Sequence, residues 1–201
     1  MIHNTHLVHT RQNPRGLFID RWGTLLTPPP RGYVKRMSEV EFLPGAMDAL
    51  YRAVRLGWNI YLIGNEEAVA FGAQTEVAWR KIETGICDAL AAHGAPVTRS
   101  YSCLDHPKGQ PGHNQPSVFR LPETGIFYHA AHNDGIELSK SWVIGDSTIE
   151  LAAAWRGELR SVGVRTGEAV LDGTLQVEPG LVVTDLAAAV DALARAQAEA
   201  A

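Results

Sequence analysis

The order of apolar and polar positions along the chain predicts strands that alternate with helices. Short apolar runs bounded by turn residues predict strands, and apolar positions that recur every three or four residues predict helices. The predicted strands cover residues 16–20, 58–63, 97–103, 142–146, 161–164 and 181–183. The first predicted helix starts near Pro44 and stops at Gly57, and the others cover residues 75–93, 125–133, 149–155 and 186–198. Such alternation is typical of a three-layer α/β/α protein with a mainly parallel sheet, right-handed crossovers and helices on both faces.

Polar and turn-forming stretches separate these elements. Residues 1–15 are polar and lack a hydrophobic period, which predicts a flexible N-terminal arm. Residues 27–41 contain three consecutive prolines, and residues 105–122 are rich in Pro, Gly and His, so both stretches are predicted to be loops. No internal repeat or linker is visible in the sequence. Residues 16–201 are therefore expected to form a single domain.

Composition narrows the classes of partner and the compartment. The formal net charge of −4 argues against nucleic acid or an anionic membrane as the main partner. The two cysteines, Cys87 and Cys103, are too few for a disulfide framework and suit a reducing compartment. No apolar run approaches the length of a membrane span, and the first residues lack the layout of a signal peptide. We therefore expect a cytoplasmic protein; the sequence makes no prediction of its oligomeric state.

Two predicted strands end in a carboxylate, and these are the strongest candidates for chemistry. Asp20 ends the apolar run from Gly16, and Asp146 ends the run from Trp142. If the two strands are neighbours, both carboxylates lie at the carboxyl edge of the sheet, where α/β proteins build their sites. Two close carboxylates repel each other unless a cation lies between them, and hard oxygen ligands suit Mg²⁺. The alternative interpretation is that each Asp only caps the helix that follows it.

Several strings then resemble motifs of the haloacid dehalogenase (HAD) superfamily. The turn after the first strand is similar to motif I of its phosphatases, which reads Asp-x-Asp-Gly-Thr/Val. More narrowly, the chain resembles the branch that contains D-glycero-D-manno-heptose-1,7-bisphosphate 7-phosphatase and histidinol-phosphate phosphatase. The resemblance extends over most of the chain and implies an HAD-like (Rossmannoid) fold with little or no cap. The strings that carry it are Asp20-Arg21-Trp22-Gly23, Gly32-Tyr33-Val34, Glu41-Phe42-Leu43-Pro44-Gly45, Ser141-Trp142-Val143-Ile144-Gly145-Asp146 and Arg165-Thr166-Gly167.

The resemblance implies a nucleophile and a metal site. Asp20 would attack phosphorus and form an aspartyl-phosphate that water then cleaves. Mg²⁺ would be held by Asp20, by the main-chain carbonyl of Trp22 and by Asp146, with Glu150 at a nearby acidic position. Glu150 has an almost equally good alternative role, as a negative charge that favours the N-terminus of the following helix.

The resemblance also implies phosphate and substrate contacts. Asn65 and Arg120 stand at positions that would contact the phosphate during catalysis. Arg21, Thr24, Gly64 and Arg36 are further candidate substrate contacts. An arginine in this set could bind a second phosphate or a carboxylate with two hydrogen bonds. The expected partner is a small phosphorylated metabolite.

Three departures from the family pattern affect the predicted activity. Trp22 replaces the second Asp of motif I, whose general acid–base role is worth roughly 10²–10⁴-fold. Gly64 lacks the hydroxyl that motif II normally offers. Leu121 replaces the motif III Lys, and the loss of such a charge costs about 3 kcal/mol of transition-state stabilisation by analogy with oxyanion-hole deletions. Together they predict a slow phosphatase or none.

The zinc site of the related branch is predicted to be missing. Cys103 remains, but Asp105, Ser117 and Phe119 stand where the branch has its other His and Cys ligands. Cys103, His106 and His113 could make a different site, and the spacing leaves that alternative open.

Three functions therefore remain open at the level of the sequence. The first is a slow HAD-type phosphatase that acts on a small phosphorylated sugar or alcohol. The second is an inactive relative that binds a phosphorylated ligand or a partner. The third is an atypical hydrolase of the dehalogenase type, because family dehalogenases carry an aromatic Tyr at the position of Trp22.

Overall fold

Six parallel strands form the central sheet in the computed structural model, which describes residues 15–30 and 32–199. The strands are β1 (Gly16–Asp20), β2 (Asn59–Ile63), β3 (Val97–Ser100), β4 (Trp142–Gly145), β5 (Arg160–Val164) and β6 (Val182–Val183). Their order across the sheet is β3-β2-β1-β4-β5-β6. The predicted parallel α/β sheet is therefore confirmed.

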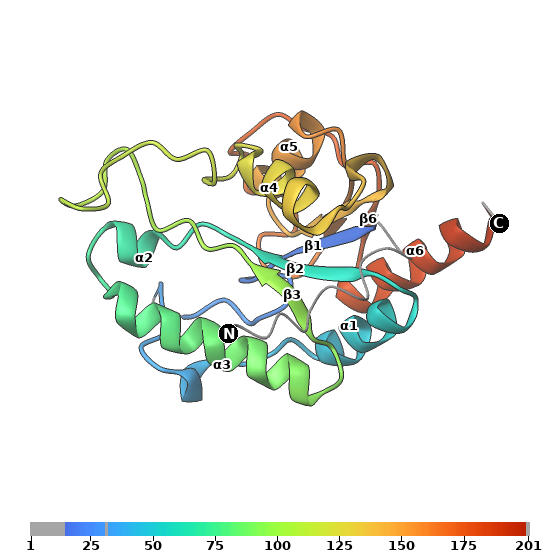
Figure 1. Ribbon diagram of the computed structural model, residues 1–201, viewed down its shortest axis with the longest axis horizontal. Helices are drawn as coiled ribbons and strands as arrows, with labels where there is room; N and C mark the ends of the chain where they lie inside the picture. Colours follow the sequence, from blue (N-terminus) through green and yellow to red (C-terminus); the bar gives the residue numbers. More distant parts are fainter. Residues whose placement is uncertain (1–14, 31, 200–201) are drawn as a thin grey trace, which may run out of the picture.

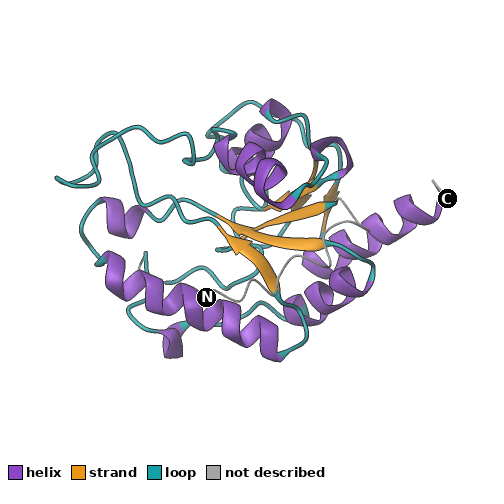
Figure 2. Ribbon diagram, in the orientation of Figure 1, coloured by secondary structure: helices purple, strands orange, loops and turns teal. Residues whose placement is uncertain are grey.

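Helices cover both faces of this sheet, which makes three layers. Figure 1 shows α1, α3 and α6 on one side of the sheet and α4 and α5 on the other. The helices are α1 (Ala46–Arg55), α2 (Glu67–Ala70), α3 (Glu76–Ala92), α4 (Gly125–Asp134), α5 (Thr148–Arg156) and α6 (Leu186–Glu199), with short 3-10 helices at Met37–Glu39 and Leu138–Lys140. The long segment between β3 and α4 is a loop that extends beyond α2, as the sequence predicted (Figure 2).

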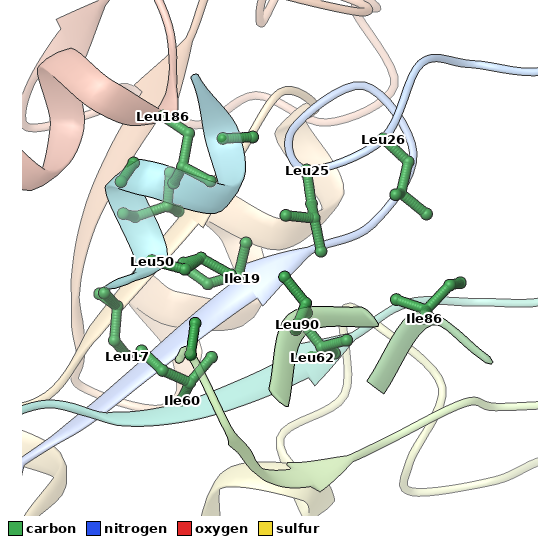
Figure 3. Close-up of a cluster of buried hydrophobic side chains, with 14 of the residues drawn as sticks. Leu17, Ile19, Leu25, Leu26, Leu50, Ile60, Leu62, Ile86, Leu90 and Leu186 are labelled. Carbon is green, nitrogen blue, oxygen red and sulfur yellow. The ribbon is translucent and has the colours of Figure 1, made fainter. Parts of the chain in front are cut away.

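Side chains of each strand alternate between the two helical layers because successive residues of a strand point to opposite faces. Leu17 and Ile19 of β1 belong to the larger core, where Leu50 of α1 and Leu186 of α6 pack beside them (Figure 3). Phe18 points the other way, into a smaller core under α4 and α5. There it stacks on Tyr61 at 4.7 Å between ring centroids and meets the edge of Phe127 at 4.9 Å. All five residues of β1 are buried, so this strand is held from both faces.

The strand order creates a crevice between β1 and β4. From β1 the chain continues to β2 and β3 on one side, and later to β4, β5 and β6 on the other. In parallel sheets, ligands bind outside the carboxyl ends of the strands at the point where the order reverses. The pairing of Ile19 with Ile144 is the last between these two strands. Asp20 and Asp146 follow that pair and therefore open into the crevice.

Three local predictions were wrong. The predicted loop over residues 27–41 contains the 3-10 helix Met37–Glu39, which the backbone bond from Val40 to Met37 closes at 3.0 Å. The strand predicted at 97–103 ends at Ser100, because the register against β2 shifts and Cys103 keeps only an isolated bridge to Asn65. Helix α2 was not predicted, since a single turn carries too little periodicity to be read from sequence.

Two further expectations concern parts of the chain beyond the sheet. The arm predicted over residues 1–15 falls, except for Arg15, outside the described residues. Within 15–30 and 32–199, no helix is long and apolar enough to cross a membrane.

Candidate active site

Asp20 and Asp146 meet at the crevice between β1 and β4. The Asp20 side chain is 7% exposed and that of Asp146 is 3% exposed. Both carboxyl groups line one pocket, and the negative charge of Asp146 is among the causes that raise the pKa of Asp20. The fold therefore brings together the two strand-end carboxylates that the sequence singled out.

A close-fitting shell holds Asp146 in place. Its Oδ1 accepts a hydrogen bond from the Thr24 hydroxyl at 3.2 Å, and its Oδ2 accepts one from the Glu168 backbone N–H at 2.7 Å. Gly23 and Gly167 lie against the same carboxylate, and a Cβ added to either would come within 2.2 or 2.0 Å of Oδ2. Both glycines also have positive φ angles, of 93° and 59°. Thr24 is fully buried and uses its hydroxyl on Asp146, so the structure does not place it as the predicted substrate contact.

Glu150 adds a third carboxylate to this buried group. It lies in the first turn of α5 and is 7% exposed, and the Ser147 hydroxyl donates a short hydrogen bond to it. Burial, followed by the charges of Glu150 and Asp146, raises the pKa of Asp20 well above its usual value. Burial also raises the pKa of Asp146, and it raises the pKa of Glu150 to about 7. Ionisation of any of these three groups without a cation nearby therefore destabilises the folded protein.

A pocket of about 360 Å³ opens over these carboxylates. Its walls come from the loop after β1, the loop before α1, the ends of β2 and β4, and the first turn of α3. The residues that line it are Asp20, Trp22, Gly32, Tyr33, Val34, Gly64, Asn65, Glu66, Glu67, Ala68, Gln74, Trp79, Asp146, Ser147, Ile149, Glu150 and Glu168. The mixture of carboxylates and aromatic rings is suited to a small polar ligand.

Trp22 occupies the place beside Asp20 where the family pattern has its second Asp. The indole is half-buried, packs against the larger core and lines the pocket. Its Nε1 lies 3.5 Å from Glu66 Oε2, at the limit of a hydrogen bond. The indole therefore narrows the pocket but supplies no group that could exchange a proton with a substrate.

Arg21, a predicted substrate contact, is not among the residues that line the pocket. The side chain is fully buried and its Nε donates to Glu66 Oε1 at 2.9 Å. Its Nη2 donates to the Tyr101 carbonyl at 3.0 Å and to the Ser102 hydroxyl at 2.8 Å. Arg21 thus ties the turn after β1 to Glu66 and to the chain after β3.

Gly64 and Asn65 follow β2 and reach the pocket as predicted, but in different ways. A Cβ at Gly64 would lie 3.5 Å from Asp20 Oδ1, so the backbone here runs close to the carboxylate. The Asn65 amide is engaged with the backbone of Leu121: it donates to the carbonyl at 2.9 Å and accepts from the N–H at 3.0 Å. Asn65 therefore joins the end of β2 to the loop before α4.

Leu121 turns away from the pocket. Its side chain is 2% exposed and belongs to the smaller core under α4 and α5. A lysine at this position would have to bury its charge among apolar groups or leave the core, at a cost of several kcal/mol. The missing charge cannot be restored by substitution at this residue alone.

The two remaining arginine candidates do not line the pocket. Arg120 forms an ion pair of 2.5 Å with Glu67, which does line the pocket, and is 19% exposed. Arg36 is 75% exposed and pairs with Glu39 on the 3-10 helix. Each guanidinium is held by an acidic neighbour, and neither is among the residues that line the pocket with Asp20.

The loop that would hold zinc in the related branch has its polar groups engaged locally. The buried Cys103 thiol donates to the Asp105 carbonyl at 3.5 Å, and His113 Nδ1 lies 3.4 Å from Asp105 Oδ1. His106 Nδ1 accepts from the Lys108 backbone N–H at 2.9 Å. Within the described part of the chain, no three His, Cys, Asp or Glu side chains are arranged as a ready metal site. The absence of zinc stays a prediction.

The sequence did not single out several residues of the pocket. Glu66 and Glu67 come directly after Gly64-Asn65, and Glu168 follows Arg165-Thr166-Gly167, so their position at strand ends was a usable signal. Trp79 lies on α3, far along the chain, and only the packing of that helix brings its ring to the pocket. No local pattern distinguishes it from an ordinary core residue.

Removing divalent cations is expected to make the protein less stable as the pH rises. A carboxyl group whose pKa is raised by folding stabilises the folded state only while it keeps its proton. With EDTA present, the free energy of unfolding should therefore fall between about pH 5 and 8, as Glu150 and its neighbours ionise. Urea titrations at several pH values would measure this. Glu150→Gln should show a shallower fall, and a wild-type stability that is constant or rises over this range would contradict the expectation.

Comparisons with known proteins agree with the motifs and the fold. The family model for HAD-hydrolase-like proteins matches residues 118–189. The D-glycero-beta-D-manno-heptose-1,7-bisphosphate 7-phosphatase of Haemophilus ducreyi is 28% identical over 158 residues, which cover 78% of this chain and 86% of that protein. The enzyme of the same name from Escherichia coli is 27% identical and covers 77% of this chain and 81% of its own length.

A solved structure gives the same result. The D,D-heptose 1,7-bisphosphate phosphatase from B. bronchiseptica, in a complex with magnesium and phosphate, matches with a TM-score of 0.78 and 26% identity. The match covers 90% of this chain and 99% of that one. The chain is therefore similar to HAD-like proteins and, among them, to heptose-bisphosphate phosphatases, as the motifs predicted.

Proposed function

We propose that the chain is a Mg²⁺-dependent phosphomonoester hydrolase that acts on a small phosphorylated sugar or alcohol, with Asp20 as the nucleophile. The observation that carries the proposal is that Asp20 and Asp146, which follow neighbouring parallel strands, line one pocket. A carboxylate in this position is aimed at a ligand that enters from the crevice. The named activity of the relatives, removal of a phosphate from a sugar, is of the same class.

The donor set fits a magnesium ion. Asp20 and Asp146 offer hard carboxylate oxygens, and the main-chain carbonyl of Trp22 is the third proposed ligand. The raised pKa values of both carboxyl groups give a physical reason for a cation here, since it would offset their repulsion. Glu150 would add negative charge close to the ion. When bound, Mg²⁺ would supply charge neutralisation for the incoming phosphate.

The chain's own residues would carry two displacements. In the first, an Asp20 carboxylate oxygen bonds to phosphorus while the bond from phosphorus to the leaving oxygen breaks, giving an aspartyl-phosphate and an alkoxide that takes a proton from water. In the second, water attacks the same phosphorus and frees Asp20 and inorganic phosphate. Thr24 and the Glu168 backbone would keep Asp146 fixed during both steps. The Gly64 backbone would lie close to the attacked phosphate.

Turnover is proposed to be slow because no group replaces the missing acid. Trp22 cannot protonate the leaving oxygen or activate water, and this role is worth roughly 10²–10⁴-fold. A second candidate function is supported by the same region: with Arg120 paired to Glu67 and Leu121 buried, the chain could bind a phosphorylated ligand without cleaving it.

A substrate screen tests the proposed function. Purified protein would be incubated with Mg²⁺ and a panel of sugar and alcohol phosphates, and release of inorganic phosphate would be measured. Hydrolysis that needs Mg²⁺, stops with EDTA and is lost in Asp20→Asn is the expected result. Binding of these ligands with no phosphate release would favour the second candidate function.

Magnesium is expected to stabilise the wild-type protein but not Asp146→Ala. A ligand that binds only the folded state stabilises it by about 2.7 kcal/mol when its concentration is 100 times Kd. Thermal unfolding with increasing Mg²⁺ would measure the effect. Asp172→Ala is a useful control, because this Asp lies in the same region but accepts hydrogen bonds from Thr148 instead. An equal Mg²⁺ response in Asp146→Ala and the wild type would rule the site out.

We also propose that the protein works in the reducing environment of the cytoplasm. Cys87 and Cys103 are both free thiols, as a reducing compartment permits. The proposed partner is a small phosphorylated metabolite.

A further inference from the structure

The pocket is lined by acidic side chains and by no basic ones among the described residues. The six carboxylates are Asp20, Glu66, Glu67, Asp146, Glu150 and Glu168. A pocket of one sign of charge raises the local concentration of ligands with the opposite sign and repels those with the same sign. This arrangement is unexpected for a site that receives a phosphate dianion, and it limits what else the ligand can carry.

Only part of this negative charge is offset. Glu66 is paired with the buried Arg21 at 2.9 Å, and Glu67 is paired with Arg120 at 2.5 Å. Asp20 and Asp146 would face the proposed magnesium ion. Glu150 and Glu168 have no basic partner among the described residues, so a ligand in the pocket still meets net negative charge. One phosphate can be accommodated at the ion, but a second would meet no cation among the pocket-lining residues that the structure describes.

The pocket wall away from Asp20 offers aromatic surface and hydrogen-bond acceptors. Trp79 is 1% exposed, and its Nε1 is buried with no hydrogen-bond partner in the structure. Its ring is fixed from below by the Arg21 guanidinium, 5.3 Å from the ring centroid. A buried indole N–H without an acceptor is costly unless a ligand oxygen or a water fills the place. The carboxylates beside it can accept hydrogen bonds from hydroxyl or ammonium groups.

From these contacts we infer that the substrate is a monophosphate ester whose leaving group carries hydrogen-bond donors and no second anionic group. The inference rests on the proposed function and makes it narrower. A hydroxyl group of the leaving group would donate to Glu66 or Glu67, which line the pocket. The relatives named above are heptose-1,7-bisphosphate phosphatases, so this chain would differ from them in rejecting the second phosphate.

Matched substrates test the inference. The kcat/KM for glucose 1,6-bisphosphate would be compared with those for glucose 6-phosphate and glucose 1-phosphate at saturating free Mg²⁺. We expect the bisphosphate to be at least about tenfold poorer than the better monophosphate, and the difference to shrink as salt is added. Phosphoethanolamine, whose leaving group carries an ammonium and no further hydroxyl group, separates recognition of cations from recognition of hydroxyl groups. A bisphosphate that is as good as or better than both monophosphates would overturn the inference.

A charge variant links any preference to the pocket. Glu67→Gln removes one pocket carboxylate and frees Arg120, so it should raise the ratio of bisphosphate to monophosphate kcat/KM at least about threefold. Glu123→Gln is the matched control: Glu123 is similarly exposed, pairs with Arg156 at 3.4 Å and does not line this pocket. Its ratio should equal that of the wild type. An equal rise in both variants would show that the pocket carboxylate is not the cause.

The same ligands distinguish a failure of this inference from a failure of the proposed function. If no substrate is turned over, the proposed function fails, and calorimetric Kd values for glucose 6-phosphate and glucose 1,6-bisphosphate still decide the inference. Weaker binding of the bisphosphate supports it. Equal or tighter binding, or no binding of the monophosphate at millimolar concentration, overturns it.

Discussion

Asp20→Asn is expected to lower kcat/KM for any phosphate ester by at least about a thousandfold, as removal of a catalytic nucleophile does in other covalent enzymes. The amide keeps the shape of the side chain but cannot form the aspartyl-phosphate. It also removes one negative charge from a buried group of three carboxylates. The variant should therefore be at least as stable as the wild type when no divalent cation is present. Steady-state kinetics and thermal unfolding in EDTA would measure the two effects.

The control for this variant is Asp191→Asn. Asp191 lies on α6, is exposed and pairs with Arg52 at 3.1 Å, far from the crevice in the sequence and in the fold. It should leave kinetics and stability close to those of the wild type. If Asp20→Asn keeps more than a tenth of the activity while folded, Asp20 is not the nucleophile, whatever else the pocket does.

Trp22→Asp is expected to raise kcat/KM at least about tenfold, which is only about 1.4 kcal/mol of barrier. The new carboxyl group would stand where the family pattern has its general acid. Glu66, whose Oε2 lies 3.5 Å from the indole nitrogen, would be its near neighbour. A like charge at that distance raises the pKa of a carboxyl group, and this favours the protonated form that the leaving oxygen needs. The gain should be largest for alkyl phosphates, whose leaving groups are poor.

Trp22→Asn separates the effect of the new carboxyl group from the effect of removing the indole ring. Both variants remove the same ring from the edge of the larger core and should lose similar stability. Only the Asp variant gains a group that can give and take a proton. Equal kcat/KM values for the two folded variants would contradict the proposal that the missing acid limits turnover.

The sequence predicted the sheet and the base of the site because both depend on local patterns. Apolar runs such as 16–20 and 142–146 predict buried strands. A carboxylate that ends such a run is expected at the carboxyl edge of the sheet. The prediction assumed that these two strands are neighbours, and the strand order of the sheet meets that condition. Asp20 and Asp146 were found in this way, whereas Glu150 came from the resemblance.

The direction of side chains that follow a strand could not be predicted in the same way. Arg21 is next to Asp20 in the sequence, yet the turn sends it under the pocket, where Glu66 and the chain after β3 offer it partners. Leu121 stands at a motif position but packs into a core whose members come from β1, β2, β4, α4, α5 and the segments between them. Trp79 reaches the pocket only because α3 packs beside β3. Each depends on packing between distant segments, which a motif does not encode.

The most direct test of the central claim, that Asp20 forms a covalent phosphoryl-enzyme, is stopped-flow kinetics with p-nitrophenyl phosphate. Its leaving group departs without a general acid, whereas the second step still lacks a group that activates water. The account therefore predicts a rapid Mg²⁺-dependent release of about one equivalent of p-nitrophenol per chain, followed by slow turnover. The burst should be absent in Asp20→Asn and should diminish in Trp22→Asp, where the second step is faster. Release with no burst at any substrate concentration, or a burst that persists in Asp20→Asn, would contradict it.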